Sequence, residues 1–146
     1  MNDLAQIVAL LHDDMLGESR EQSTDPLPGE YQRAFEAIVE DPNNDIFVNV
    51  LEERVIACMQ VSFLPGLSHL GAWRAQIESV RVLDSLRHQG IGESMIAFAI
   101  DQAWSRGCTI VQLTTDKRRL GARRFYETLG FRATHEGMKF ELPRSD

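Results

Sequence analysis

A pair of glycines between an apolar segment and a helix-forming segment limits the folds open to this chain. Residues 75–83 are rich in apolar and β-branched side chains and predict a strand. Residues 92–105 predict a helix, which Gly107 would end as a C-terminal cap. The linking segment reads Arg87-His88-Gln89-Gly90-Ile91-Gly92, and its glycines allow a tight turn. The chain therefore contains a strand–turn–helix unit, which is typical of α/β folds.

Periodicity and turn residues predict further elements along the whole chain. The predicted helices cover residues 3–16, 31–39, 92–105 and 119–128, and the predicted strands cover residues 46–51, 55–64, 75–83, 109–113 and 138–142. The first two strands would form a hairpin across Glu52-Glu53-Arg54. A chain of 146 residues can bury one sizeable core and is too short for two ordinary domains. We therefore expect one domain, residues 1–146, with helices packed on a central sheet.

The strand at residues 75–83 carries an irregular alternation. Its apolar residues occupy odd positions at Ala75 and Ile77 and then even positions at Val80 and Val82, so the parity changes near Glu78-Ser79. An inserted residue, a β-bulge, would return both halves to one face and leave a backbone N–H outside the ladder. Burial of both faces of a central strand would also explain the pattern. The sequence leaves these two interpretations open.

The glycine-containing turn is suited to bind an anion, but it does not match a nucleotide-binding fingerprint. Two glycines ahead of a helix present backbone N–H groups, and the N-terminus of the helix adds a partial positive charge, so a pyrophosphate would fit. However, Met95 occupies the third glycine position of GxGxxG, and no GxxxxGK[ST] follows. ATP and NAD are therefore not expected as ligands.

Charge and composition exclude several classes of protein. A net charge of -7 disfavours a nucleic-acid partner and mildly favours a cationic small molecule such as an amine. No apolar run long enough for a membrane span and no secretory signal is evident, so we expect a cytoplasmic protein. Cys58 and Cys108 lie in apolar segments without a CxxC pair, and we expect buried reduced thiols rather than a disulfide or metal site.

Two segments together resemble the GNAT superfamily of acetyl-CoA-dependent N-acetyltransferases. The pattern Arg87-x-x-Gly90-x-Gly92 resembles the family's acetyl-CoA loop, and residues 122–131 resemble its closing segment A-x-x-F-Y-E-x-L-G-F. The resemblance covers residues 46–142, while the first 45 residues match only as two generic helices. It implies an α/β fold with a mixed, mostly antiparallel central sheet, flanking helices and a bulged central strand. The strand that commonly opens the family would be absent, very short or missing.

The resemblance also implies roles for particular residues. Glu78 would be the general base, and Tyr126 would protonate the departing thiolate. Val80 would direct its N–H toward the thioester oxygen. Arg119 stands where the family often has an asparagine that contacts the arm of the coenzyme, so this contact is in question. The full set expected to bind acetyl-CoA is Val80, Arg81, Val82, Arg87, His88, Gln89, Gly90, Ile91, Gly92, Glu93, Arg119 and Tyr126. No metal is implied.

Each of these residues also has a purely structural interpretation. Tyr126 lies at helical spacing from Leu129 and could belong to the core, and Glu78 could be a solvated strand residue or an ion-pair partner. His88 is most simply a residue of a surface loop. A basic cluster could be a solvated helix face or could attract the phosphates of coenzyme A; it comprises Lys117, Arg118, Arg119, Arg123 and Arg124.

The expected activity is transfer of an acetyl group from acetyl-CoA to a primary amine of a small molecule or peptide, by direct attack on the thioester. Two other functions stay open at this point. The segments Ile77-Glu78-Ser79-Val80 and Gly107-Cys108 faintly resemble amino-sugar-phosphate acetyltransferases. The chain could also be a non-catalytic acyl-CoA-binding or regulatory module. Similar proteins are often dimers, so a homodimer is expected too.

Overall fold

The computed structural model describes residues 2–145. The chain forms two compact units, Met1–Leu113 and Thr114–Asp146. The first unit holds the sheet and most of the helices, and the second holds one short helix and an irregular C-terminal segment. The expectation of a single domain over residues 1–146 stays a prediction.

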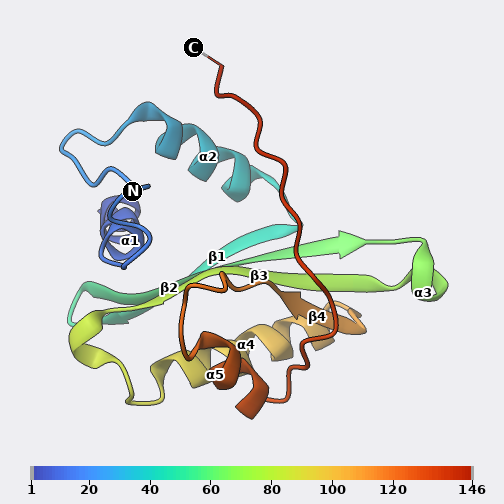
Figure 1. Ribbon diagram of the computed structural model, residues 1–146. Coiled ribbons are helices and arrows are strands. Elements are labelled where there is room, and N and C mark those ends of the chain that lie inside the picture. Colours follow the sequence, from blue (N-terminus) through green and yellow to red (C-terminus); the bar gives the residue numbers. More distant parts are fainter. Residues whose placement is uncertain (1, 146) are drawn as a thin grey trace. The chain divides into compact units, whose positions relative to one another are not determined.

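The sheet of the first unit has four strands in the order β1-β2-β3-β4 (Figure 1). These strands are β1 (Asn44–Leu51), β2 (Arg54–Pro65), β3 (Trp73–Val82) and β4 (Ile110–Leu113). The first three pair antiparallel, and β4 pairs parallel to β3. The predicted hairpin and the mixed, mostly antiparallel sheet are therefore confirmed. Within residues 2–145, two helices precede the first strand.

Helices cover both faces of this sheet. Helices α1 (Asn2–His12) and α2 (Gly29–Glu40) lie on one face, and α4 (Ile91–Ser105) lies on the other (Figure 1). Ile7 and Leu10 of α1 pack with Cys58 of β2. On the opposite face, Phe47 of β1 meets Phe98 of α4 edge to face at 4.9 Å between ring centroids. No helix within residues 2–145 is long and apolar enough to cross a membrane.

A layer of buried apolar side chains lies between the sheet and α4. Met59, Val61 and Phe63 alternate along β2 toward α4 and are almost completely buried. Ile77 of β3 and Ile96 of α4 close the same layer. Each such side chain contributes about 1.5–3 kcal/mol through removal of apolar surface from water. This layer packs β3 against α4.

Two predicted helix boundaries were wrong by several residues. The first helix ends at His12 instead of continuing to residue 16, because residues 13–20 turn back in bends and turns. The helix predicted from Arg119 begins only at Ala122, where α5 (Ala122–Thr128) starts. Gly121 precedes it with a φ of 89°, a left-handed conformation that a helix cannot pass through.

The strand predicted at residues 138–142 was also wrong, since residues 131–145 have no regular secondary structure. Alternation of apolar residues predicts strand conformation only where a partner strand supplies the hydrogen bonds. The described pairings of the sheet involve β1 to β4 and do not include this segment.

Candidate active site

The predicted irregularity in β3 is a β-bulge. Cys58 of β2 pairs with Arg81, whereas Gln60 pairs with Glu78. Met59 alone therefore opposes both Ser79 and Val80. Ser79 has a φ of 56°, outside the range of a regular strand. The bulge displaces the backbone at these two positions from the regular ladder, as expected for a strand that directs an N–H group away from its neighbour.

The thiol of Cys58 lies against this bulge. Its Sγ donates a hydrogen bond to the carbonyl oxygen of Ser79 at 3.7 Å. Burial raises the pKa of Cys58 to about 11, and the nearby Arg81 guanidinium opposes that rise only in part. The thiol is therefore protonated at neutral pH. Both Cys58 and Cys108 are buried and free, as the sequence predicts.

The glycine loop follows β3 and leads into α4. A short 3-10 helix, η1 (Asp84–Leu86), precedes the loop, and Gly90 is the N-cap of α4 with a φ of 83°. This N-cap supplies no side chain to accept a hydrogen bond from the first turn. An added Cβ at Gly90 would meet no heavy atom within 4 Å, so the space beside the N-terminus of α4 is open. The first-turn N–H groups can therefore reach an anionic ligand there.

The side chains of Arg87 and Arg81 are engaged within the first unit. Arg87 forms an ion pair with Asp84 at 3.0 Å and donates to the carbonyl oxygen of Val82 at 3.3 Å. Arg81 pairs with Asp14 at 3.7 Å on the α1 side of the sheet. The Arg81 guanidinium is therefore held on the α1 side of the sheet, and the expected role of Arg81 in binding the coenzyme stays a prediction.

Glu78 is exposed on the face of the sheet opposite α4. It lies directly before the bulge and is the partner of Gln60 across the β2–β3 pair. The amide nitrogen of Gln76 donates to Glu78 Oε1 at 2.6 Å. Gln76 in turn accepts at 3.0 Å from the amide of Gln112 in β4. A carboxylate held by a donor and open to solvent on one side can accept a proton from an amine.

Sequence reasoning missed the two glutamines. Gln76 stands two residues before Glu78, and alternate residues of a strand share a face, so this neighbour could have been found from spacing. Gln112 could not have been found in this way, because its pairing with Gln76 depends on the parallel register of β4 against β3.

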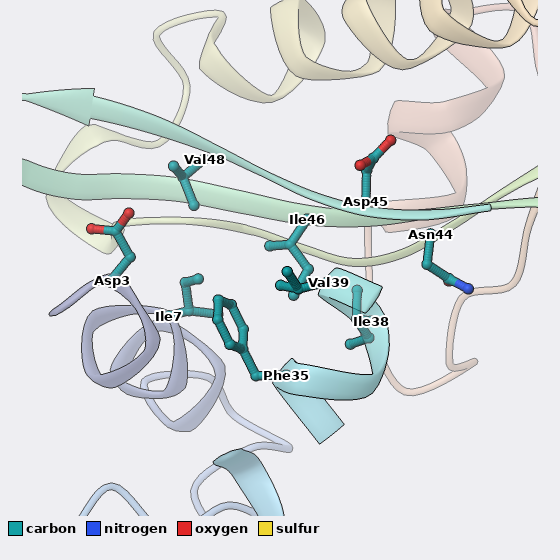
Figure 2. A pocket seen from close by; sticks show the side chains of 9 residues that line it. All are labelled: Asp3, Ile7, Phe35, Ile38, Val39, Asn44, Asp45, Ile46 and Val48. Atoms are coloured by element: carbon teal, nitrogen blue, oxygen red, sulfur yellow. The ribbon is translucent and has the colours of Figure 1, made fainter. Parts of the chain in front are cut away.

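A hollow of the first unit lies between α1, α2 and β1 (Figure 2). Its lining is mainly apolar: Phe35 and Val39 come from α2, Ile7 from α1 and Ile46 from β1. In Figure 2, the Asp3 carboxylate stands at its edge. The hollow lies on the same face of the sheet as Glu78.

Tyr126 lies in the second unit, in a cluster of aromatic rings. Its ring is 5.1 Å from that of Phe125 and 5.8 Å from that of Phe131, both at edge-to-face angles. Arg119 lies in the turn before α5 and donates its backbone N–H to the carbonyl oxygen of Asp116. The roles of Tyr126 and Arg119 at the thioester stay predictions.

Carboxylates accompany much of the predicted basic cluster. Arg118 pairs with Asp116 at 2.7 Å, and this guanidinium holds the pKa of the Asp116 carboxyl well below its usual range. Lys117 pairs with Glu136 at 3.4 Å. Arg123 pairs with Glu127 across one helical turn at 2.7 Å. Because these charges are partly neutralised, they favour the solvated-surface interpretation for these three residues.

A family model described as the acetyltransferase (GNAT) family matches residues 9–131. The matched span includes the bulged strand, the glycine loop and Tyr126. A solved structure from Bacillus halodurans C-125, described as a transcriptional regulator, is 48% identical with a TM-score of 0.95. That likeness covers 97% of this chain and 94% of the other.

Two enzymes are similar in sequence. An aminoalkylphosphonate N-acetyltransferase from Salmonella typhimurium is 28% identical over 105 residues, which cover 72% of this chain and 68% of the relative. A glucosamine 6-phosphate N-acetyltransferase from Trypanosoma brucei brucei is 30% identical over 97 residues, 66% of this chain and 64% of the relative. The chain thus spans about two thirds of the length of these two relatives.

Proposed function

Because the chain belongs to the GNAT family of acetyltransferases, we propose that it transfers an acetyl group from acetyl-CoA to a primary amine of a small molecule or peptide. The amine attacks the thioester directly. The observation that carries this proposal is the β-bulge at Ser79 and Val80, followed in the same strand–helix unit by the Gly90-capped start of α4. The bulge supplies a displaced backbone donor, and the helix start supplies an anion site.

The residues of the glycine loop fit the pyrophosphate of coenzyme A. The N-terminus of α4 lacks a side-chain cap, and the space beside Gly90 is open. Backbone N–H groups of residues 91–93 would bind the phosphates, and the helix dipole would favour their negative charge. When bound, acetyl-CoA supplies the activated thioester, so the protein needs to supply only placement and electrostatics. No residue of this scheme requires a metal ion.

The acceptor must lose a proton for the reaction to proceed. A lysine-like amine has a pKa of about 10.4, so roughly one molecule in 2,500 is a free nucleophile at pH 7. Glu78 would accept that proton, directly or through a water molecule. Its exposed carboxylate beside the bulge supports this role.

The remaining groups would act on the two ends of the breaking bond. The backbone N–H of Val80 would donate to the thioester oxygen as negative charge grows there, an effect typically of a few kcal/mol. Tyr126 would donate its hydroxyl proton to the departing sulfur. Both roles rest on the family resemblance together with the bulge and the aromatic cluster of α5.

The acceptor class is the finer part of the proposal. The names of the two similar enzymes refer to amines that carry a phosphonate or a phosphate group. Amines bearing a phosphorus anion are therefore the second candidate acceptors, beside cationic amines. A non-catalytic regulatory module is the alternative from another class, supported by the description of the Bacillus halodurans relative. We expect a homodimer in the cytoplasm, which sedimentation and cell fractionation would test.

One experiment separates these functions. The purified chain is incubated with acetyl-CoA and a panel of amines: a polyamine, a lysine peptide, an aminoalkylphosphonate and glucosamine 6-phosphate. Released thiol is measured, and coenzyme binding is measured in parallel by calorimetry. We expect amine-dependent thiol release with at least one member. Binding of the coenzyme without release on any amine would support the regulatory module, and absence of binding would contradict the proposal.

A further inference from the structure

Polar side chains form a continuous row across one face of the sheet. Asn44 pairs with Ser62, Ser62 with Gln76, and Gln76 with Gln112, so the row runs through β1, β2, β3 and β4 in register. Ser62 donates to Asn44 Oδ1 at 2.6 Å. The opposite face at the same strands is almost purely apolar and is covered by α4. This row therefore lies on the side of the sheet that carries Glu78.

The half of the row nearest Glu78 is a directed chain of hydrogen bonds. Gln112 donates its amide N–H to Gln76 Oε1 at 3.0 Å, and Gln76 donates its own amide N–H to Glu78 Oε1 at 2.6 Å. The Glu78 carboxylate can only accept, so the amide nitrogen of Gln76 faces it, and the carbonyl oxygen of Gln76 is held by the donor of Gln112. Gln76 therefore presents a donor to the carboxylate.

The hydrogen bond from Gln76 limits the orientations open to the exposed Glu78 carboxylate. A glutamate on a strand surface samples several rotamers, and only some direct an oxygen to the reacting nitrogen. A donor held by its own partner selects one of them. With Oε1 engaged by Gln76, Oε2 is the oxygen left to accept a proton. Glu78 would thus be placed before the acceptor arrives.

We propose that Gln76 and Gln112 are positioning residues that hold the Glu78 carboxylate in the orientation needed to deprotonate the acceptor amine. The inference rests on the proposed function. In the assisted step the nitrogen–carbon bond forms and the carbon–sulfur bond breaks. The acceptor ammonium first gives one proton to Glu78 Oε2, which releases it to solvent. After the attack the nitrogen loses its second proton, and that proton replaces the one that Tyr126 gives to the sulfur.

The test compares kcat/KM over pH 6.5–10 with the best acceptor of the panel. Gln76→Met removes the donor to Glu78 while keeping a long unbranched side chain. Gln112→Met removes the hydrogen bond that holds the Gln76 amide. Glu78→Gln is the reference, and Gln60→Met is the matched control. Gln60 is half-buried on the same face, but its amide hydrogen bonds to Asn44 at 3.5 Å instead of Glu78.

We expect the variants to lose kcat/KM in a way that depends on pH and on the presence of Glu78. Glu78→Gln should lower kcat/KM about 100-fold at pH 7, the lower end of general-base contributions. That loss in kcat/KM should shrink toward pH 10, where about a quarter of a lysine-like amine is unprotonated without help. Gln76→Met should lower kcat/KM about 10-fold at pH 7 and Gln112→Met about 3-fold, and both losses should also shrink toward pH 10. Coenzyme affinity should stay within twofold, and the Gln60→Met profile should keep the wild-type shape.

A double mutant distinguishes positioning from packing. In a Glu78→Gln background, Gln76→Met should have little further effect, because it acts through the missing carboxylate. An additive loss, a loss independent of pH, or a loss below twofold would overturn the inference while leaving Glu78 as the base. A pH-independent Glu78→Gln defect would instead refute the proposed base and this inference with it. If Gln76→Met does not fold, Gln112→Met decides by the same criteria.

Discussion

The carboxylate of Asp14 and the guanidinium of Arg81 lie 3.7 Å apart, and the two side chains are only 11% and 14% exposed. Asp14 comes two residues after the end of α1, and Arg81 follows the bulge of β3. The pair therefore connects the segment after α1 to the strand that carries the proposed base. Its low exposure means that neither charge can regain full hydration if its partner is removed.

We expect Arg81→Met to lower the free energy of unfolding by about 3–5 kcal/mol, because it leaves the Asp14 charge largely buried without this partner. Adding Asp14→Leu should recover most of that loss, since both charges are then gone. Urea denaturation of the single and double variants measures both effects. Arg33→Met is the control: its pair with Glu30 is 3.9 Å long and exposed, so about 0–1 kcal/mol is expected. Equal losses for the two single variants would contradict this account.

Gly90 and Gly107 flank α4 and provide a matched test of the phosphate site. Their φ angles are 83° and 80°, and an added Cβ at either would meet nothing within 4 Å. Valine at either position should therefore cost a similar amount of stability, on the order of 1–2 kcal/mol or more from left-handed strain. Only Gly90→Val should also obstruct the phosphates. We expect calorimetry to show coenzyme affinity reduced at least 10-fold for Gly90→Val and unchanged for Gly107→Val.

The buried thiol beside the bulge should make stability depend on alkaline pH. Burial raises the pKa of Cys58 from 9.0 to about 11 in the folded chain, so the folded state keeps its proton where the unfolded state loses it. The stabilising contribution is complete below pH 9 and is lost as pH rises toward 11, at most about 2–3 kcal/mol. Urea denaturation at pH 7.5 and pH 10 measures it.

Cys58→Ala isolates this thiol from other alkaline titrations. The variant should be less stable at pH 7.5 because a buried sulfur is lost. It should also lose less stability than the wild type between pH 7.5 and pH 10. Identical pH dependence of the two proteins would show that Cys58 does not contribute to it.

The sequence predicted the features that local patterns control. The parity break between Ala75 and Ile77 on one side and Val80 and Val82 on the other indicated either a bulge or burial of both faces, and the register decides for the bulge. The start of α4 was visible because Gly90 needs a positive φ at a helix N-cap. Both depend only on neighbouring residues, and together they define much of the proposed site.

Features set by distant partners could not be predicted in this way. The residues 138–142 alternate like a strand, but alternation does not reveal whether a partner edge is available. The engagement of Arg81 by Asp14 needs the return of the chain after α1 onto the sheet. The orientation of Glu78 needs the register of β4, which places Gln112 beside Gln76.

The last prediction concerns Tyr126, whose ring packs between Phe125 and Phe131. A phenol has a reference pKa of about 10 and is protonated at neutral pH, while a coenzyme thiolate resembling cysteine, with a pKa of about 8.5, needs only moderate help to leave. Tyr126→Phe keeps the ring contacts and removes the hydroxyl. We therefore expect turnover to fall by roughly 10²–10⁴-fold, with coenzyme affinity nearly intact.

Tyr31→Phe is the control for this prediction, because Tyr31 is the other tyrosine of the chain. Tyr31 lies in α2, and its hydroxyl donates a hydrogen bond at 2.7 Å to Glu21 in the segment before that helix. Its loss should lower stability slightly and leave turnover unchanged. Turnover and coenzyme dissociation are measured for both variants with the same amine. Turnover of Tyr126→Phe within about twofold of wild type, worth only ~0.4 kcal/mol in activation free energy, would make Tyr126 a packing residue. Weakened coenzyme binding with unchanged turnover at saturation would instead assign its hydroxyl to anchoring the donor, and the proton for the thiolate would then come from water.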